Sequence, residues 1–197
     1  CLLVPWKAEE IKRYVAGIPD YRSVNFEGNG GLIFMADVTD NFVAAVMKQS
    51  RYDNREAKAQ LKIVYTPLHG TGNVPVQKVL RLDGFENIWA VAEQVVPDGD
   101  FPTVVTPNPE DEGALKLGIE QAERTGGDLV LATDPDSDRV GAAVKTDDGY
   151  VLMTGNQIGA LLMDFVLENT KLTKKSAVVK TVVTSELGGE IARKKGL

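Results

Sequence analysis

The amino-acid sequence predicts an α/β fold in which a mixed, largely parallel sheet is flanked by helices. Three observations lead to this class. Short β-rich runs alternate with helical patterns between residues 61 and 133, glycine and proline separate these segments, and a hairpin pattern follows at 139–153. A strand–helix–strand order requires right-handed crossovers between parallel strands.

The chain begins with Cys1 rather than methionine, and its last residues follow a helical pattern. We therefore expect it to be a piece of a longer polypeptide.

The segments before the alternating region are predicted to be mainly helical. Apolar residues recur at helical spacing within residues 8–21 and 39–50, and Pro19 is expected to end the first helix. A glycine-rich turn is expected between them at 25–32. The polar run 51–60 is expected to be an exposed helix end or connector.

The alternating region is predicted to contain three strands and two helices. Pro75 suits the first turn of the first helix, and Asn108 is expected to cap the second, whose first turn then begins at Pro109. A proline-rich loop is expected at 95–111. The predicted order is strand 62–66, helix 73–84, strand 87–93, helix 109–125 and strand 128–133.

The segments beyond residue 133 are predicted to be a hairpin, a helix and a strand. The hairpin at 139–153 is expected to turn at Asp148-Gly149. A long amphipathic helix is expected at 154–169, and one more strand at 176–185. Lys180 in that strand is expected to face solvent or another domain rather than to catalyse.

Composition places the chain among ordinary soluble globular proteins. Of its 197 residues 43% are hydrophobic and 25% are charged. The net charge of −6 argues against nucleic acid as a partner, and no apolar run approaches the roughly 20 residues that a membrane span needs. Because the single cysteine cannot form an internal disulfide, we expect a reducing, cytoplasmic location.

Three aspartates, Asp134, Asp136 and Asp138, directly follow the strand expected at 128–133. Ligands of α/β sheets bind beyond the carboxyl ends of strands, where this loop falls. In an extended loop alternate side chains point the same way, so two such carboxylates 4 Å apart would repel by about 4 kcal/mol at a surface-like dielectric. A hard divalent cation would relieve this repulsion, and Mg²⁺ is favoured over Ca²⁺ because only three protein ligands are evident.

The neighbouring residues refine this hypothesis. An EF-hand loop starting at Asp134 is excluded, because its sixth and twelfth positions hold Arg139 and Lys145 instead of glycine and glutamate. Arg139 is predicted to contact phosphate or sugar oxygens, which offsets the negative charge that three carboxylates retain beside one metal ion. The plainer alternative is an acidic surface turn with a neighbouring ion pair.

His69, the only histidine, is a second candidate catalytic residue. It lies in a predicted strand-to-helix turn, where Gly70 and Gly72 could let backbone amides approach an anion at the helix N-terminus. Two roles stay open for His69: contact with the substrate, or a structural hydrogen bond that holds the loop.

With these residues in place, the chain resembles the α-D-phosphohexomutase superfamily, most closely its phosphoglucomutase and phosphomannomutase group. The resemblance covers roughly residues 60–190 and rests on five ordered blocks. They are KIVYTPLHGTG, VPDGDFPTVVTPNPED, ATDPDSDRVG, GYVLMTGNQIGALL and KTVVTSELG.

The resemblance implies a fold, a reaction and a metal. It implies that Asp134, Asp136 and Asp138 bind Mg²⁺ and that Arg139 is an active-site arginine. In such enzymes a phosphoserine of the first domain donates its phosphoryl group to a hexose 1- or 6-phosphate, and the resulting bisphosphate turns around in the cleft. The nucleophile loop, Thr-Ala-Ser-His-Asn-Pro, is absent from this sequence. The resemblance therefore implies that residues 1–150 are the second domain with a preceding linker helix and that residues 151–197 are the truncated start of the third, a further α/β domain. The chain is expected to be inactive alone, with sugar phosphates and the remaining domains as its partners.

Two other functions remain open from the sequence. LVLATDPDS also resembles the strand-then-Asp-x-Asp start of haloacid-dehalogenase-type phosphatases, in which Asp134 would be the nucleophile and Asp136 the acid or base. The other is a non-catalytic cation-binding module. Within the mutases, glucose, mannose and pentose phosphates are all candidate substrates.

Overall fold

The computed structural model describes residues 4–25 and 36–197, which fall into two units, Cys1–Val38 and Thr39–Leu197. The first unit contains helix α1, Pro5–Ala16, and a 3-10 turn, η1, at Tyr21–Ser23. Helix α1 ends before Pro19, because Gly17 already caps it through bonds to carbonyls of the last turn. The glycine-rich turn expected at 25–32 lies, beyond Asn25, outside the described residues.

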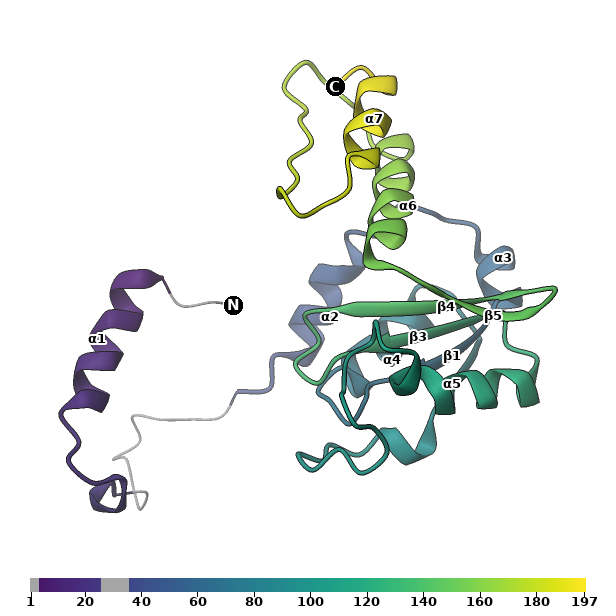
Figure 1. Cartoon of the computed structure of the whole chain (residues 1–197). Helices are drawn as coiled ribbons and strands as arrows, with labels where there is room; N and C mark the ends of the chain where they lie inside the picture. The colour runs from purple at the N-terminus through teal and green to yellow at the C-terminus, as the bar shows by residue number, and fades with distance from the viewer. Residues whose placement is uncertain (1–3, 26–35) are drawn as a thin grey trace. The chain divides into compact units, whose positions relative to one another are not determined.

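The second unit is built on a five-stranded mixed sheet (Figure 1), which confirms the predicted fold class. The strand order is β2-β1-β3-β4-β5. Strand β1 is parallel to β2 and β3, whereas β3, β4 and β5 pair antiparallel, so the parallel part is confined to the first three strands. The strands are β1 Lys62–Thr66, β2 Asn87–Ala90, β3 Leu129–Thr133, β4 Val140–Thr146 and β5 Gly149–Met153.

Helices connect the parallel strands as the sequence predicts. Helix α4, Asn73–Leu82, joins β1 to β2, and α5, Glu112–Thr125, joins β2 to β3 after a short 3-10 turn, η2, at Ala92–Gln94. Because the two crossovers run in opposite directions along the sheet, their common right-handedness places α4 and α5 on opposite faces. The fold thus brings the ends of β1 and β3 together at one edge.

The hydrophobic core lies between α5 and the sheet. Helix α5 packs against β1 and β3, which are the central strands and the most deeply buried. Gly118 allows this close approach, because a Cβ there would come within 2.8 Å of a Val130 methyl carbon. The fully buried core side chains are Val64, Leu68, Leu115, Ala122, Val130, Ala132 and Ala143.

The helices before β1 include one departure from the prediction. Helix α2, Thr39–Met47, packs against α4 and buries Val43. The polar run 51–60, expected to be exposed, forms α3, Arg55–Gln60, in which Lys58 is buried. Lys58 can be buried because its Nζ lies 2.8 Å from a carboxylate oxygen of Asp83, so the charge is paired.

Some predicted boundaries in the α/β region were wrong, and the strand expected at 87–93 ends at Ala90. Helix α5 begins at Glu112, with Asp111 rather than Asn108 as its N-cap; the Asp111 carboxylate accepts a bond from the Gly113 amide at 3.0 Å. The β4–β5 hairpin turns at residues 147–148, one position earlier than expected, because Thr146 pairs with Gly149. Gly149, at φ 116°, supplies the left-handed backbone just after the turn.

The C-terminal segment contains two helices packed side by side (Figure 1), α6 Gly155–Glu168 and α7 Leu187–Lys194. The strand expected at 176–185 is absent, and this described segment has neither helical nor strand structure. A strand needs a neighbouring strand for its hydrogen bonds. The final helix ends at Lys194, before the last residues, where Gly196 adopts φ 82°.

Strand β5 reaches Met153, beyond the predicted domain boundary at residue 150. The domain division at that point stays a prediction. Among the helices of the described residues, none combines the length and the apolar character that crossing a lipid bilayer requires.

Candidate metal centre

The aspartate loop joins the carboxyl end of β3 to β4, at the edge where β1 also ends. The loop is a tight turn rather than the extended segment that the sequence argument assumed. The Ser137 amide donates to the Asp134 carbonyl at 3.0 Å, and Ser137 adopts a left-handed backbone with φ 62°. The predicted convergence of the three side chains therefore has to come from the turn.

The turn does bring the three carboxylates together. One oxygen each from Asp134, Asp136 and Asp138 lies within 4.8 Å of the other two. Asp134 is almost completely buried, whereas Asp136 and Asp138 are exposed. The group thus has one fixed carboxylate at its base and two that solvent can reach.

Arg139 fixes the buried carboxylate. Its backbone amide donates to one oxygen of Asp134 at 2.9 Å, and its Nε donates to the other at 2.8 Å. Its Nη1 donates to the side-chain oxygen of Asn108 at 3.1 Å. The guanidinium therefore lies between the aspartate loop and the proline-rich loop, with about half of its side-chain surface exposed.

These contacts determine the protonation of the loop. Burial raises the pKa of Asp134, but the hydrogen bonds and the charge of Arg139 outweigh it, so the net pKa is lowered. The charge of Asp136, followed by the proximity of Asp134, raises the pKa of Asp138. The hydrogen bond to Asp134 raises the pKa of Arg139. Asp138 is thus the carboxylate that the crowding of like charges most disfavours.

The donor set fits a hard divalent cation. Oxygen ligands of Mg²⁺ lie at about 2.1 Å from the ion, so two of them are at most about 4.2 Å apart. The observed limit of 4.8 Å is close to this value, and the two exposed side chains can close the difference by rotation. Arg139 alone leaves the cluster of three carboxylates with a net negative charge, which a cation would neutralise.

His69 lies in the β1–α4 loop, where the sequence places it, and its ring is buried. Its Nδ1 lies 3.1 Å from the Val96 carbonyl and its Nε2 lies 2.8 Å from the Thr103 hydroxyl. Phe101 packs edge-on to the ring. Both ring nitrogens therefore have partners within the protein, which favours the structural role over contact with a substrate.

The glycines of the same loop, Gly70 and Gly72, allow close packing instead of forming the anion site that the sequence suggested. A Cβ on Gly70 would overlap the backbone of Pro135, and one on Gly72 would lie 2.7 Å from the hydroxyls of Ser137 and Thr133. The Gly70 amide donates to the Pro67 carbonyl at 2.8 Å. The glycines thus allow the β1–α4 loop to pack directly against the aspartate loop.

Sequence reasoning missed two residues of this site, Thr71 and Asn108. The Thr71 amide donates to the Pro135 carbonyl at 2.9 Å, and Asn108 orients Arg139. Asn108 carried a signal that pointed elsewhere, because asparagine before proline and acidic residues is typical of a helix N-cap. Thr71 carried no signal apart from its place between two glycines.

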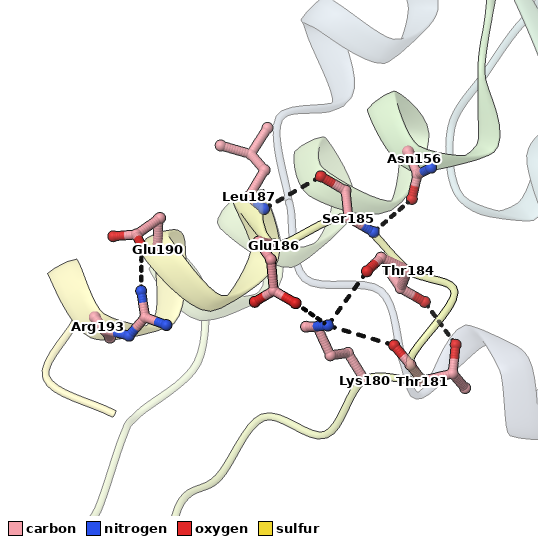
Figure 2. Close-up of polar contacts among 9 residues, drawn as sticks. All are labelled: Asn156, Lys180, Thr181, Thr184, Ser185, Glu186, Leu187, Glu190 and Arg193. Carbon is pink, nitrogen blue, oxygen red and sulfur yellow. Dashed lines mark hydrogen bonds and ion pairs between the residues drawn. The ribbon is translucent and has the colours of Figure 1, made fainter.

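Figure 2 shows a second polar cluster, in the C-terminal segment, which shares no residue with this centre. Lys180 donates to the carbonyl of Thr184 at 3.2 Å and forms an ion pair with Glu186 at 2.7 Å. The Ser185 amide donates to the side chain of Asn156 at 2.9 Å, which ties this turn to α6. Lys180 thus stabilises its own turn, and the role expected for it, in solvent or at another domain, stays a prediction.

Comparison with known proteins identifies the family. Residues 40–149, more than half of the chain, match the family described as phosphoglucomutase/phosphomannomutase, alpha/beta/alpha domain II. The phosphoglucomutase of Staphylococcus aureus strain MRSA252 is 32% identical over 192 residues, covering 94% of this chain and 34% of the relative. That of strain USA300 is 34% identical over 161 residues, covering 81% of this chain and 29% of the relative.

Solved structures agree on the fold. The crystal structure of a phosphoglucomutase/phosphomannomutase family protein from Burkholderia thailandensis, 23% identical in sequence, matches 67% of this chain and 26% of its own with a TM-score of 0.54. The chain spans about a third of the length of the curated relatives named above. The sequence match, the mixed sheet and the resemblance seen in the motifs agree, and this chain belongs to the phosphoglucomutase/phosphomannomutase family, whose domain II it contains.

Proposed function

We propose that this chain supplies the metal-binding loop of a magnesium-dependent phosphosugar mutase that interconverts hexose 1-phosphate and hexose 6-phosphate. The observation that carries the proposal is the convergence of Asp134, Asp136 and Asp138 at the end of β3 in a chain of this family. The relatives named above are phosphoglucomutases, which supports glucose phosphates as substrates. Phosphomannomutase and phosphopentomutase activities are the alternatives within the superfamily.

The residues of the loop suit phosphoryl transfer. When bound, Mg²⁺ would stabilise the negative charge of a phosphoryl group in transfer. Asp134 would be the fixed ligand, because Arg139 engages both of its oxygens, and Asp136 and Asp138 would adjust around the ion. Three carboxylates, one guanidinium and a divalent ion sum to zero charge, so an incoming phosphate meets no net repulsion. The exposed part of Arg139 can then contact phosphate or sugar oxygens.

The rest of the reaction is assigned to other parts of the polypeptide. In this proposal residues 1–150 are domain II with its linker helix, residues 151–197 begin domain III, and a phosphoserine of another domain exchanges its phosphoryl group through a bisphosphate intermediate. The 197-residue chain alone is expected to be inactive. A cytoplasmic location belongs to the proposal, because Cys1 offers no internal disulfide.

The family match favours the mutase over the phosphatase alternative. It covers residues 40–149, whereas the phosphatase resemblance covered a single motif.

The metal site can be tested on the 197-residue chain by titration with Mn²⁺, followed by electron paramagnetic resonance, with Mg²⁺ as competitor. Asp134→Asn, Asp136→Asn and Asp138→Asn are each expected to weaken binding at least tenfold, because each removes one of three ligands. Asp147→Asn and Asp148→Asn, in the exposed hairpin turn, are matched controls and should leave the affinity unchanged. Absence of saturable binding, or an equal loss in the controls, would contradict the proposal.

The reaction can be tested on the full-length protein. Glucose 1-phosphate, mannose 1-phosphate and ribose 1-phosphate would be assayed with and without Mg²⁺. We expect Mg²⁺-dependent conversion, fastest with glucose 1-phosphate. Turnover by the 197-residue chain itself would refute the assignment of the nucleophile to another domain.

A further inference from the structure

The β1–α4 loop holds an unfavourable backbone conformation beside the aspartate loop. Leu68 and His69 are consecutive non-glycine residues in the left-handed region, with φ 47° and φ 61°. Such residues persist only where their surroundings hold them in place, and they cluster at functional sites. The contacts that hold Leu68 and His69 in this conformation therefore indicate the role of the loop.

A buried chain of hydrogen bonds holds one side of the loop. The Thr66 hydroxyl accepts from the Leu68 amide at 3.0 Å and donates to Gln94 Oε1 at 2.6 Å. Gln94 Nε2 donates to the Thr103 hydroxyl at 2.9 Å, and that hydroxyl lies 2.8 Å from His69 Nε2. Thr66, Gln94 and His69 are all buried, so solvent cannot readily replace these partners.

The chain has a defined direction at His69. Because the Val96 carbonyl can only accept, the Nδ1 of His69 carries the proton and donates to it at 3.1 Å. Nε2 of the neutral ring is then an acceptor for the Thr103 hydroxyl. The backbone of His69 is held as well, since its amide donates to the Gln94 carbonyl at 2.9 Å.

The other side of the same loop, at Gly70 and Thr71, contacts the residues that lie between the aspartates. Thr71 donates to the Pro135 carbonyl from both its amide, at 2.9 Å, and its hydroxyl, at 3.2 Å. The Thr71 and Ser137 hydroxyls lie 3.4 Å apart, and Gly70 packs directly on Pro135. Pro135 and Ser137 alternate with the three aspartates, so any shift of residues 70–71 is passed to the carboxylates.

We propose that His69 is a positioning residue for the metal centre, which it reaches through the loop and not by contact. Its ring anchors residues 69–71 to the proline-rich segment, and Thr71 and Gly70 then hold the aspartate turn in the converged arrangement. The inference rests on the proposed function, because it assumes that the aspartates bind a cation. His69 thereby has a role although both of its ring nitrogens already have hydrogen-bond partners within the protein.

The test compares three variants of the 197-residue chain. His69→Ala removes the ring. His69→Asn is the conservative variant, because asparagine tolerates positive φ and its side-chain NH₂ can replace the Nδ1 donor to Val96. Leu115→Ala is the control: it removes a fully buried side chain of α5 from the hydrophobic core and should lower stability while leaving the hydrogen bonds of His69 and Thr71 in place.

Two measurements separate positioning from simple stability. The first is Mn²⁺ affinity, in which His69→Ala is expected to lose tenfold or more, His69→Asn to recover most of the loss, and Leu115→Ala to match the unaltered chain. The second is hydrogen exchange without metal at the amides of Thr71, Ser137 and Arg139, which is expected to accelerate in His69→Ala alone.

The outcomes distinguish this inference from the proposed function. If the unaltered chain fails to bind Mn²⁺, the proposed metal site is wrong, and the exchange measurement still decides whether His69 holds the turn. If His69→Ala is folded and shows unchanged affinity and unchanged exchange, the positioning role is wrong. Should His69→Ala fail to fold, Thr71→Val replaces it, because it removes the hydroxyl contact with Pro135 and must produce the same two effects.

Discussion

Tyr65 shows how a single buried side chain ties the two strand ends of the centre together. It lies in β1 with no exposed surface, and its hydroxyl lies 2.8 Å from that of Thr133 at the end of β3. Burial raises the pKa of Tyr65 to about 12, although the Thr133 hydrogen bond acts in the opposite direction. The strand that precedes the aspartates is thereby joined to the strand that precedes His69.

This phenol gives the protein a predictable sensitivity to high pH. The pKa is about 10 in the unfolded chain and about 12 in the folded one, so the folded state retains a proton that the unfolded state has lost. The contribution of this protonated phenol to the free energy of unfolding is fully present below pH 10 and is lost as the pH rises to about 12. The loss is at most about 1.4 kcal/mol per pH unit. Urea unfolding of the wild-type chain and Tyr65→Phe from pH 9 to 12 measures this difference. If the free energy of unfolding falls equally with pH in the two proteins, Tyr65 does not titrate as described.

At the scale of the elements, the approach of β4 to the proline-rich loop depends on Gly141. A Cβ at this position would overlap the carbonyl oxygen of Pro109. Gly141→Ala is therefore expected to lower the free energy of unfolding by about 1–3 kcal/mol, as overpacking does elsewhere. Gly159 in α6 is the matched control, because a Cβ added there would meet nothing within 4 Å and alanine favours a helix by about 1 kcal/mol over glycine.

Chemical denaturation of both glycine variants tests this contrast. Gly141→Ala should shift the unfolding midpoint down, and Gly159→Ala should leave it unchanged or shift it up. A Gly141→Ala protein as stable as the parent would mean that β4 and the loop can separate without cost. The contact between β4 and the proline-rich loop would then not help to hold Asn108 beside Arg139.

The elements that the sequence predicted correctly are those whose pattern is local. Strand 62–66 and the helix starting at residue 73 were placed at their observed starts, because apolar runs, Pro75 and flanking glycines act within a few residues. The convergence of the aspartates was predicted, but the shape of their loop was not. That shape depends on Thr71 and Arg139, and Thr71 is 64 residues from the carbonyl that it binds.

The remaining errors share this cause. Asn108 has the local signature of a helix cap, but its side chain accepts a bond from Arg139, 31 residues away, and Asp111 caps α5 instead. Residues 176–185 have the composition of a strand, but among the described residues no strand pairs with them. A single sequence does not reveal which distant segment will supply such a partner.

At the scale of the whole molecule, large exposed apolar side chains occur toward both ends of the described chain, and the C-terminal segment holds several of the most exposed. Val179, Val182 and Val183 expose 85–98% of their surface, and Leu161 and Leu162 on α6 expose more than half. Isolated exposed apolar residues are common, but a valine-rich segment without a partner is unusual. The predicted division into domains, in which residues 151–197 begin a further α/β domain, would give this segment neighbours.

Within the second unit, Thr39–Leu197, helix α2 is the element whose loss can be tested by shortening the chain. Helix α2 packs against α4 and buries Val43. A chain starting at Asn54 is therefore expected to be less stable than a chain starting at Thr39 by about 1–3 kcal/mol, because it loses this buried apolar contact. Chemical denaturation of the two chains measures the difference. Equal unfolding midpoints would mean that α2 contributes nothing to the stability of the α/β unit.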